Sequence, residues 1–252
     1  MKLDILAFGA HPDDVELGCA GTLIVEKENG KKVGIIDLTK GELGTRGNIE
    51  TREEEAATAA AIMGVGIRDN LYMADGFFKN DKENRLKIIR ALRKYRPEIV
   101  LCNAPEDRHP DHGRSAGLVA DAAFLSGLQK IVTHNDDTSE GERALQEVWK
   151  PKYVFNYIQD TFIQPDFVVD ITSAMEKKLA AIQAFKTQFF TNGSGSNEEP
   201  QTYISSPEFL DSIIYRSKMF GRMIGVKYAE GFVSQKMIGI RSFDNLVKEN
   251  LS

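Results

Sequence analysis

The stretch Leu3-Asp4-Ile5-Leu6-Ala7-Phe8-Gly9-Ala10-His11-Pro12-Asp13-Asp14-Val15-Glu16 decides the fold of this chain. Residues 3–9 are mostly apolar, which is typical of a short strand buried on both faces. A helical spacing of apolar residues then runs from Asp14 to about Asn29, and Gly30 is expected to end that helix. A strand that turns sharply into a helix is the first half of a βαβ unit.

The same alternation of strand and helix continues along the chain. We expect further strands at residues 32–38, 71–73, 98–102, 154–157, 167–170 and 230–233, and further helices at 50–63, 82–95, 113–126, 172–189 and 207–223. Thr172 is a suitable N-cap for its helix, and residues 129–147 look like a polar helix and loop. This alternation predicts an α/β fold in a single domain of residues 1–252, with a Rossmann-like, mostly parallel sheet and helices on both faces.

Composition and charge exclude several classes of protein. The chain is 42% hydrophobic and 27% charged, which is ordinary for a soluble protein. Its 32 Lys and Arg against 37 Asp and Glu leave a net charge of −5, which argues against broad binding of nucleic acid or of an anionic membrane. No apolar stretch could span a bilayer, and Asp4 and His11 interrupt the N-terminal apolar run, so no signal peptide is expected. The two cysteines, Cys19 and Cys102, lie in apolar segments and are expected to be buried free thiols in the cytoplasm.

Three of the four histidines lie in two short polar clusters. His11 directly follows the first strand, whereas His109-Pro110-Asp111-His112 comes after the strand that ends at Cys102. In open α/β sheets, ligands bind beyond the carboxyl ends of the strands, where the strand order reverses. If these two strands are neighbours at that point, the two clusters meet in one site.

His11, Asp14 and His112 are the candidate metal ligands. Two imidazoles and a carboxylate commonly hold a divalent metal while leaving positions open for water and substrate. Three protein ligands are typical of catalytic zinc, and iron is a possible alternative acting as a Lewis acid. Asp13 is not needed as a ligand, so it is free to take a proton from water as a general base.

The second cluster supplies two candidate catalytic residues. His109 is expected to face the developing oxyanion or the leaving amine, and Asp111 to orient the His109 imidazole. Together with the metal ligands, these residues predict a metal-dependent hydrolase.

Other classes of protein use similar residues. A nucleotidyltransferase would carry glycine where Asp111 stands, and a glycine-rich phosphate loop after the first strand. Non-haem iron oxygenases use two histidines and a carboxylate, but mostly on β-jelly rolls. A non-catalytic metal- or sugar-binding protein is the alternative from a different class, although it would leave Asp13 and His109 without an evident purpose.

Residues 10–16 and 109–112 together resemble the LmbE/PIG-L family of metal-dependent N-deacetylases. The likeness extends through Gly41-Glu42-Leu43-Gly44-Thr45-Arg46-Gly47 and residues 51–55, and so covers most of the first half of the chain. That family removes acetyl groups from N-acetylglucosamine units of small conjugates, usually with zinc, on a Rossmann-like fold. The resemblance implies the metal ligands, base and assisting residues named above, and a homo-oligomer.

The segment Lys227-Tyr228-Ala229-Glu230-Gly231-Phe232 is similar to the bacillithiol-biosynthesis branch of the family, whose members deacetylate N-acetylglucosaminyl-malate. This implies that malate conjugate as the substrate, with chitobiose-like or inositol-linked conjugates as alternatives. Arg46, Arg52 and Arg108 are the candidate substrate-binding residues, since a guanidinium pairs bidentately with a carboxylate or phosphate. Arg52 has an alternative role, pairing with glutamates 53–55 on a helix surface.

Three features of the last third have two interpretations each. The glycine- and serine-rich residues 191–201 form either a lid or a surface loop. Tyr203 and Phe189-Phe190 beside them either close over a sugar ring or pack in the core. Phe220, Met223 and Ile224 serve either a subunit interface or the core.

Overall fold

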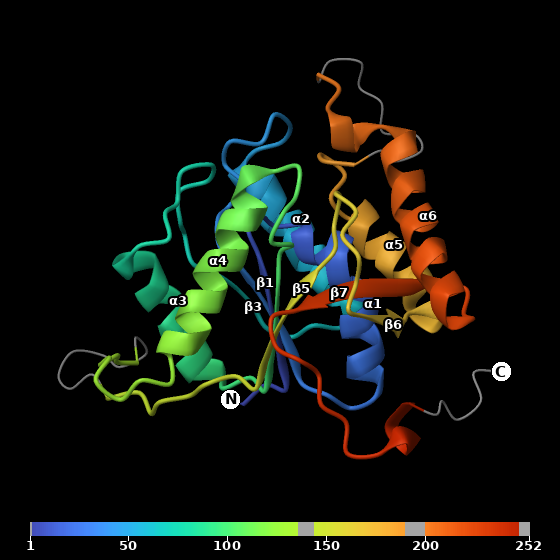
Figure 1. Cartoon of the computed structure of the whole chain (residues 1–252). Helices are drawn as coiled ribbons and strands as arrows, with labels where there is room; N and C mark the ends of the chain where they lie inside the picture. The colour runs from blue at the N-terminus through green and yellow to red at the C-terminus, as the bar shows by residue number, and fades with distance from the viewer. Residues whose placement is uncertain (1, 136–143, 190–199, 247–252) are drawn as a thin grey trace.

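The computed structural model describes residues 2–135, 144–189 and 200–246 of the chain (Figure 1). Its strands are β1 (Ile5–Gly9), β2 (Val33–Asp37), β3 (Arg68–Asn70), β4 (Ile99–Cys102), β5 (Tyr153–Tyr157), β6 (Phe167–Asp170) and β7 (Ala229–Ser234). Its α-helices are α1 (Asp14–Glu28), α2 (Ile49–Met63), α3 (Lys82–Tyr95), α4 (Pro110–Leu125), α5 (Met175–Gln183) and α6 (Pro207–Ile224). None of the helices in these ranges has the length and apolar character needed to cross a bilayer.

The strands form one seven-stranded sheet in the order β3-β2-β1-β4-β5-β7-β6. β1 lies between β2 and β4 and is parallel to both. The strand order therefore reverses at β1 and β4, as the Rossmann-like prediction requires. β7 is antiparallel to both of its neighbours, β5 and β6. The sheet is mixed but mostly parallel, which confirms the predicted fold class.

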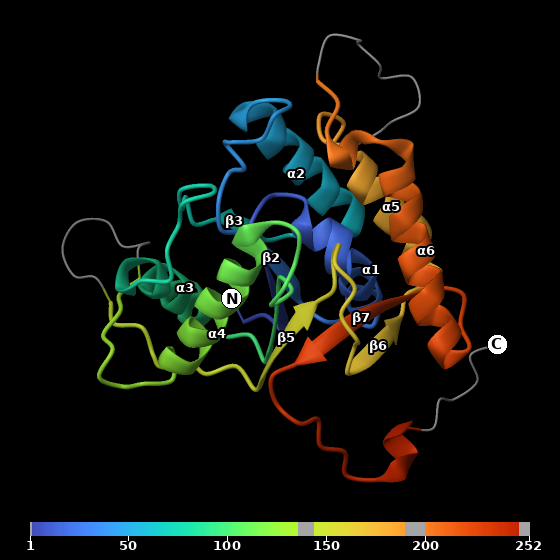
Figure 2. The ribbon, with the colours of Figure 1, turned by 45° about the horizontal axis from the view of Figure 1, so that its top comes forward.

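Helices cover both faces of the sheet (Figures 1 and 2). α3 and α4 pack on one face, and α1, α2, α5 and α6 on the other. Alternate residues of β1 supply the two cores, because successive side chains of a strand point to opposite faces. Ile5 and Ala7 join the core under α1, whereas Leu6 and Phe8 join the core under α3 and α4.

Two helices begin at other residues than the sequence predicted. Thr172 does not cap a long helix: it starts a 3₁₀ turn, Thr172–Ala174, and α5 follows only at Met175. Both the backbone N–H and the hydroxyl of Thr172 donate to Asp170 at the end of β6, so this local turn competes with an α-helical start. Residues 113–126 were expected to be helical, but α4 already begins at Pro110, with His109 as its N-cap.

The third strand was also misplaced. It is Arg68–Asn70 rather than residues 71–73, because pairing with β2 sets the register, with Asp37 opposite Asn70. Tyr72 then has a positive φ of 51°, which takes the chain out of the extended conformation. In the described part of residues 129–147 the expected polar helix is absent, and His134 pairs with Leu145 in an isolated bridge.

Helix α1 is kinked at Cys19, whose φ and ψ are −146° and 15°. A kink frees backbone groups that a straight helix would pair internally. The Glu230 carboxylate on β7 accepts hydrogen bonds from the freed N–H groups of Gly21 and Thr22. The buried Lys178 ammonium on α5 donates to the Leu17 carbonyl and to Glu230. Glu230 on β7 therefore stabilises the kinked conformation of α1.

Candidate active site

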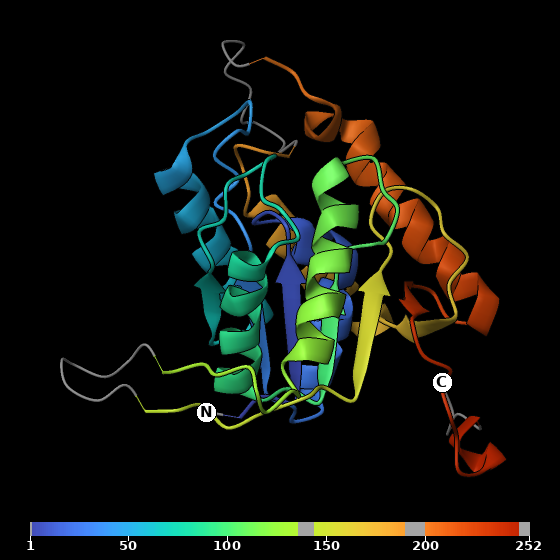
Figure 3. The same cartoon turned by 60° about the vertical axis from the view of Figure 1, so that its left-hand side comes forward.

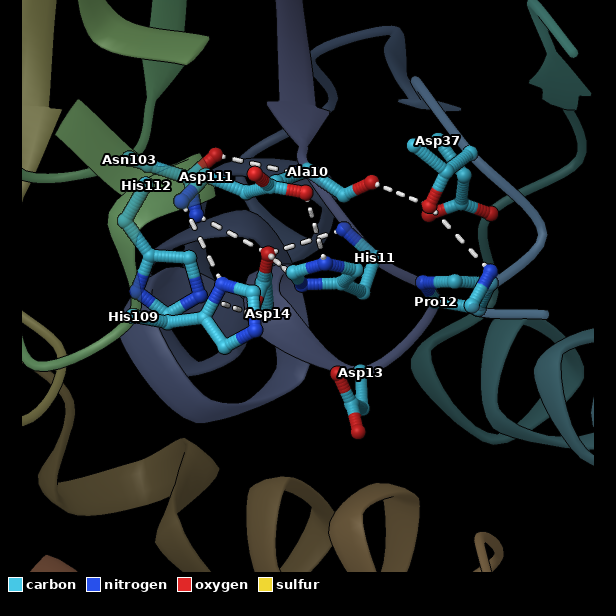
Figure 4. Close-up of polar contacts among 12 residues, drawn as sticks. Ala10, His11, Pro12, Asp13, Asp14, Asp37, Asn103, His109, Asp111 and His112 are labelled. Atoms are coloured by element: carbon cyan, nitrogen blue, oxygen red, sulfur yellow. Dashed lines mark hydrogen bonds and ion pairs between the residues drawn. The ribbon is translucent and has the colours of Figure 1, made fainter. Parts of the chain in front are cut away.

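The loop after β1 and the start of α4 meet at the carboxyl edge of the sheet, as the sequence predicted (Figure 4). The imidazole centroid of His11 lies 4.6 Å from that of His109 and 5.7 Å from that of His112. The centroids of His109 and His112 are 5.3 Å apart. Residues about a hundred positions apart in the chain therefore form one cluster.

Asp14 lies between two of these imidazoles. Its Oδ2 is 3.4 Å from Nδ1 of His11, and its Oδ1 is 3.1 Å from Nε2 of His112. All three residues are buried. The three predicted metal ligands are thus brought together, with one nitrogen of each imidazole directed at the same carboxylate.

The other nitrogen of each imidazole is held by a second carboxylate. Nε2 of His11 lies 3.0 Å from Oδ1 of Asp75, and Nδ1 of His112 lies 2.8 Å from Oδ2 of Asp107. Such a carboxylate behind a histidine fixes the tautomer and directs the opposite nitrogen at a metal. Sequence reasoning missed both aspartates. Asp107 lies two residues before His109 and could have been noticed, whereas Asp75 stands in a loop with no motif around it.

Two buried amides fix the Asp14 carboxylate. Asn103 Nδ2 donates to Oδ2 at 2.9 Å, and Gln159 Nε2 donates to Oδ1 at 2.7 Å. Asn103 also accepts a hydrogen bond from the backbone N–H of Ala10 at 2.9 Å, so it ties the loop after β1 to the end of β4. These amides were not predicted either, because single polar residues after β4 and β5 carry no sequence signal.

The pKa values of the cluster reflect its burial and its charges. Burial alone would lower the pKa of His112, but Asp14 and Asp107 outweigh it and raise that pKa to about 9. Burial likewise opposes protonation of His11, yet its three carboxylate neighbours raise its pKa well above the ordinary value. Burial would raise the pKa of Asp14, but His112 and His11 hold it well below its usual range. The site therefore stabilises positive charge between Asp14 and the two imidazoles.

This donor set fits a divalent metal. Two ligand atoms that are each about 2.0–2.1 Å from one tetrahedral zinc lie roughly 3.3–3.4 Å apart, close to the contacts that Asp14 makes with His11 and His112. The ligand atoms of His11, His109 and His112 also lie within 4.8 Å of one another, so His109 is a further possible donor. The ligand atoms of His11, Asp75 and Asp111 form a second such group. In this second group, Asp75 and Asp111 contact Nε2 of His11, whereas Nδ1 of the same ring faces Asp14.

Asp13 has a different environment from Asp14. Burial raises the pKa of Asp13 to about 7, although the Arg52 guanidinium opposes this shift. A carboxyl group that titrates near neutrality is suited to accept and return a proton. The residue also has a φ of 133°, a conformation that side chains rarely adopt and that is often found at functional sites.

Arg52 holds the Asp13 carboxylate in position. Its Nη2 donates to the Pro12 carbonyl at 2.8 Å and to Oδ2 of Asp13 at 3.0 Å. Arg52 is buried, so it does not pair with residues 53–55 on the surface of α2, as one interpretation of the sequence had it. Arg52 also lines the cavity of the site, and its role as a direct substrate ligand stays a prediction.

His109 and Asp111 are arranged differently from expectation. The Asp111 carboxylate forms no hydrogen bond with the His109 ring: it accepts from the Gly76 N–H, pairs with Arg114, and lies 3.4 Å from Nε2 of His11. The reason is local, because Asp111 in the first turn of α4 points toward the loop that carries Gly76. Instead, the Asp111 backbone N–H donates to Nδ1 of His109 at 3.3 Å. Burial and the neighbouring imidazoles lower the pKa of His109.

The cluster opens into a cavity of about 290 Å³. Its lining includes His11, Asp13, Asp14, Arg52, Asp75, Arg108, His109, His112, Gln159, Asp160, Thr202, Tyr203 and Phe209. At its rim, Nε of Arg108 donates to Asp160 at 2.9 Å, and the guanidinium lies 4.7 Å from the centre of the Tyr203 ring. The Tyr203 hydroxyl lies 3.2 Å from the same Asp160 carboxylate. Arg108 thus lies at the rim of the cavity, and its role as a substrate-binding residue stays a prediction.

Other predicted residues lie elsewhere. Arg46 is not among the described residues that line the cavity, and its carbonyl accepts from Gln188. Phe189 is buried and stacks on Phe209 in the core, whereas Tyr203 is exposed at the rim. Phe190 and most of residues 191–201 lie outside the described part of the chain.

The segment that carries the resemblance to the bacillithiol branch does not line the cavity. Residues 227–232 lead into β7, and among the described lining residues none comes from this segment. Its buried residue Glu230 accepts the backbone hydrogen bonds that stabilise the kink of α1. The segment therefore has a structural role, and it says little about the substrate.

A larger hollow of about 650 Å³ lies beside the edge strand β3. Its three carboxylates are each paired with a cation of the lining: Glu53 with Lys40, Asp37 with Arg68, and Asp69 with Lys94. The described residues that line it include no cluster of histidines and carboxylates, so the chemistry is expected in the smaller cavity.

Comparisons with known proteins agree with this geometry. The family described as "PIG-L: GlcNAc-PI de-N-acetylase" matches residues 6–124, which carry both histidine clusters. The crystal structure of the conserved protein TT1542 from Thermus thermophilus is 34% identical, with a TM-score of 0.79, over 95% of this chain and 98% of that one.

Three curated relatives differ in activity. The diacetylchitobiose deacetylase of Thermococcus kodakarensis is 29% identical over 90% of this chain and 81% of its own length. The 4-oxalmesaconate hydratase of Pseudomonas putida is 26% identical over 73% of each chain. A Bacillus anthracis protein named a probable N-acetyl-alpha-D-glucosaminyl L-malate deacetylase 2 is 26% identical over 74% of this chain and 82% of its own. Sequence, fold and site geometry together show that the chain belongs to the PIG-L (LmbE-like) family.

Proposed function

We propose that this protein is a metal-dependent N-deacetylase, which hydrolyses the acetamide of an N-acetylglucosamine conjugate. The observation that carries the proposal is that two adjacent buried aspartates at the start of α1 have different surroundings. Asp14 faces two imidazoles that carboxylates hold from behind, whereas the adjacent Asp13 faces the cavity with a pKa of about 7. The deacetylases among the relatives support this reaction.

His11, Asp14 and His112 would hold the metal, with zinc as the expected ion and iron as an alternative. When bound, such an ion polarises the acetamide carbonyl and lowers the pKa of water. Asp13 takes the proton from the attacking water, and Arg52 keeps its carboxylate in position. The C–N bond then breaks, and Asp13 returns that proton to the amine nitrogen, so that acetate and a free amine result.

His109 stabilises the oxygen that becomes negatively charged. Because its Nδ1 accepts the Asp111 N–H, its neutral form carries the proton on Nε2. Nε2 is then a donor for the oxyanion, and the lowered pKa of His109 keeps the ring neutral. Asp111 assists through its backbone N–H and through its contact with His11, rather than by orienting the His109 ring with its carboxylate.

We further propose that the aglycone is acidic, with N-acetylglucosaminyl-malate of bacillithiol biosynthesis as the first candidate. Arg108 at the rim supports this, since its Nε is bound to Asp160 and its two terminal nitrogens are available for a carboxylate. The similarity to a diacetylchitobiose deacetylase favours a neutral disaccharide as the second candidate. A cytoplasmic location is part of the proposal, and the two unpaired buried cysteines support it.

The test is acetate release from N-acetylglucosaminyl-malate, diacetylchitobiose, an inositol conjugate and free N-acetylglucosamine, each with and without chelator. Chelator-sensitive release that strongly favours the malate conjugate supports both parts of the proposal. Faster release from diacetylchitobiose would support the deacetylase reaction and would reject an acidic aglycone. If metal binds but no substrate releases acetate, the deacetylase is rejected, and a hydratase or a non-catalytic binding protein takes its place.

A further inference from the structure

Helix α6 presents one row of side chains to the body of the protein. Phe209, Ile213 and Phe220 in this row are buried, and their spacing of four and seven residues puts them on one face of the helix. Arg216 stands in the same row, three residues after Ile213 and four before Phe220, and it is half-buried. A guanidinium is therefore carried by the inward, mostly apolar face of α6.

The opposite face of α6 is exposed to solvent. It carries Tyr215, Met219 and Met223, each four residues from the next. Of the three residues with two interpretations in the sequence, Phe220 and Ile224 pack against the protein, whereas Met223 is exposed. The inward and outward faces of the helix are thus clearly separated, and Arg216 belongs to the inward one.

The elements around Arg216 form one end of the cavity. Phe209 on α6 and Tyr203 shortly before that helix both line the cavity. Asp160, a third lining residue, lies in the segment that joins β5 to β6, and this segment runs beside α6 (Figure 3). Arg216 is not itself among the described lining residues, so we place it just beyond the α6 end of the cavity.

The charge of Arg216 acts on the polar groups at this end. Burial lowers the pKa of Arg216, and Asp160 opposes that shift more than any other group, followed by Asp107. Burial and Asp160 raise the pKa of Tyr203, whereas Arg108 and Arg216 both oppose that rise. Arg108 and Arg216 therefore lie near the same carboxylate and the same phenol.

The carboxylates near Arg216 are each paired with another residue. Asp160 pairs with Arg108, Asp107 with His112, and Glu230 with Lys178. In the described part of the chain, the Arg216 guanidinium forms neither a hydrogen bond nor an ion pair of its own. Solvent reaches its nitrogens, which are not among the enclosed polar atoms that lack a partner. A half-buried cation that solvent reaches and that no protein group pairs with is suited to bind an anionic ligand.

We propose that Arg216 and Arg108 bind the two carboxylates of a dicarboxylate aglycone, with Asp160 as their common neighbour. Nε of Arg108 is held by Asp160, which leaves its terminal nitrogens for one carboxylate, and Arg216 takes the other. This inference rests on the proposed deacetylase function and favours the first of its two candidate substrates. A neutral disaccharide would leave Arg216 unpaired, whereas malate carries a negative charge for each guanidinium.

The first test compares two substrates in one variant. Arg216→Gln is expected to lower kcat/KM for N-acetylglucosaminyl-malate relative to that for diacetylchitobiose by roughly 10- to 100-fold, because a charged hydrogen bond is lost only with the acidic substrate. The loss should appear in KM rather than in kcat, since Arg216 binds the aglycone and not the reacting acetamide. Arg216→Lys keeps the charge but not the planar fork, so its loss should be smaller.

The matched control is Arg222→Gln, which removes an exposed guanidinium from the same helix and should leave the ratio unchanged. A residue that only supports the fold would affect both substrates alike. An unchanged ratio in Arg216→Gln, in protein that circular dichroism shows to be folded, would therefore overturn the proposal.

Binding of malate tests the subsite without any turnover. L-Malate and L-lactate share a 2-hydroxyl and a neighbouring carboxylate, so both coordinate a bound metal alike, but only malate has a second carboxylate. Calorimetric titration of the zinc-loaded protein is expected to show malate binding roughly tenfold more tightly than lactate, and Arg216→Gln should abolish this preference. Equal binding of the two acids to the wild-type protein would reject the subsite. If malate is preferred but no substrate releases acetate, the deacetylase function fails while the subsite stands.

Discussion

Oδ1 of Asp75 lies 3.0 Å from Nε2 of His11, although the two residues are 64 positions apart in the sequence. The Leu43 N–H donates to the other Asp75 oxygen at 2.9 Å, so the carboxylate is fixed from both sides. Burial would raise the pKa of Asp75, but the contact with His11 outweighs it and lowers that pKa to about 2. Asp75 therefore accepts from the distal N–H of His11 and directs Nδ1 toward Asp14.

We expect Asp75→Ala to weaken zinc affinity by about 10- to 100-fold, as is usual when a carboxylate behind a ligating histidine is lost. A competition titration with a chromophoric chelator measures this. The control is Asp211→Ala, which removes an exposed carboxylate on α6. Equal zinc affinity in Asp75→Ala and wild type would show that Asp75 does not orient His11.

Asp13→Asn should lower kcat by roughly 10²- to 10⁴-fold, because the asparagine amide cannot accept the proton of the attacking water. Metal content, measured by mass spectrometry of the purified protein, should stay the same, since Asp13 is not among the expected ligands. Undiminished turnover would show that Asp13 is not the general base. Loss of the metal would instead make it a ligand.

Zinc should stabilise the wild-type protein and not the His112→Ala variant. A ligand present at a hundred times its Kd adds about 2.7 kcal/mol to the free energy of unfolding. The measurement is the change in Tm on adding zinc to chelator-treated protein, compared within each variant, so that any effect of the substitution on the fold cancels. An equal increase in His112→Ala would place the ion elsewhere.

Two adjacent lysines on α5 should differ widely in their effect on stability. The side chains of Lys178 and Glu230 are 2% and 3% exposed, and replacing either partner leaves the other charge buried without an opposite charge. We expect Lys178→Met to cost about 3–5 kcal/mol in urea unfolding. Adding Glu230→Gln to it should cost less than the sum of the two single changes. Lys177→Met, which breaks a half-exposed pair with Glu28, should change stability by less than about 1 kcal/mol.

Neither cysteine should react with a thiol reagent in the native protein. Burial raises the pKa of Cys102 to about 12 and that of Cys19 well above its ordinary value. A thiol is reactive only as its thiolate, and at pH 8 that form is scarce for both. Colorimetric titration should therefore find two reactive thiols only after denaturation. Fewer than two in the denatured chain would indicate a disulfide.

The sequence predicted those parts of the site that depend on local patterns. His11 and Asp14 belong to one strand–helix junction, and the parallel sheet places His112 beside them, because β1 and β4 are neighbours. The supporting residues could not be predicted in this way. Asn103, Asp75 and Gln159 reach the site through tertiary packing, and single polar residues in loops carry no periodicity.

The errors in the fold have two causes. The register of β3 is set by pairing with the distant strand β2. The start of α5 is set by a local turn, because Thr172 donates to Asp170 two positions earlier. The last strand was predicted, but its antiparallel insertion between β5 and β6 was not. Strand order and direction depend on contacts between distant parts of the chain, which local patterns do not contain.

The attachment of α1 to β7 has a consequence for how the protein is made. The helix that starts beside Asp13 has its kink completed by Glu230, which is more than 200 residues later in the chain. A ribosome releases the N-terminal half, with every predicted metal ligand, long before that carboxylate exists. The kinked helix α1, which begins beside Asp13, therefore reaches its final form only after Glu230 has been synthesised. A fragment limited to residues 6–124 contains the motifs but lacks the strand that fastens their helix.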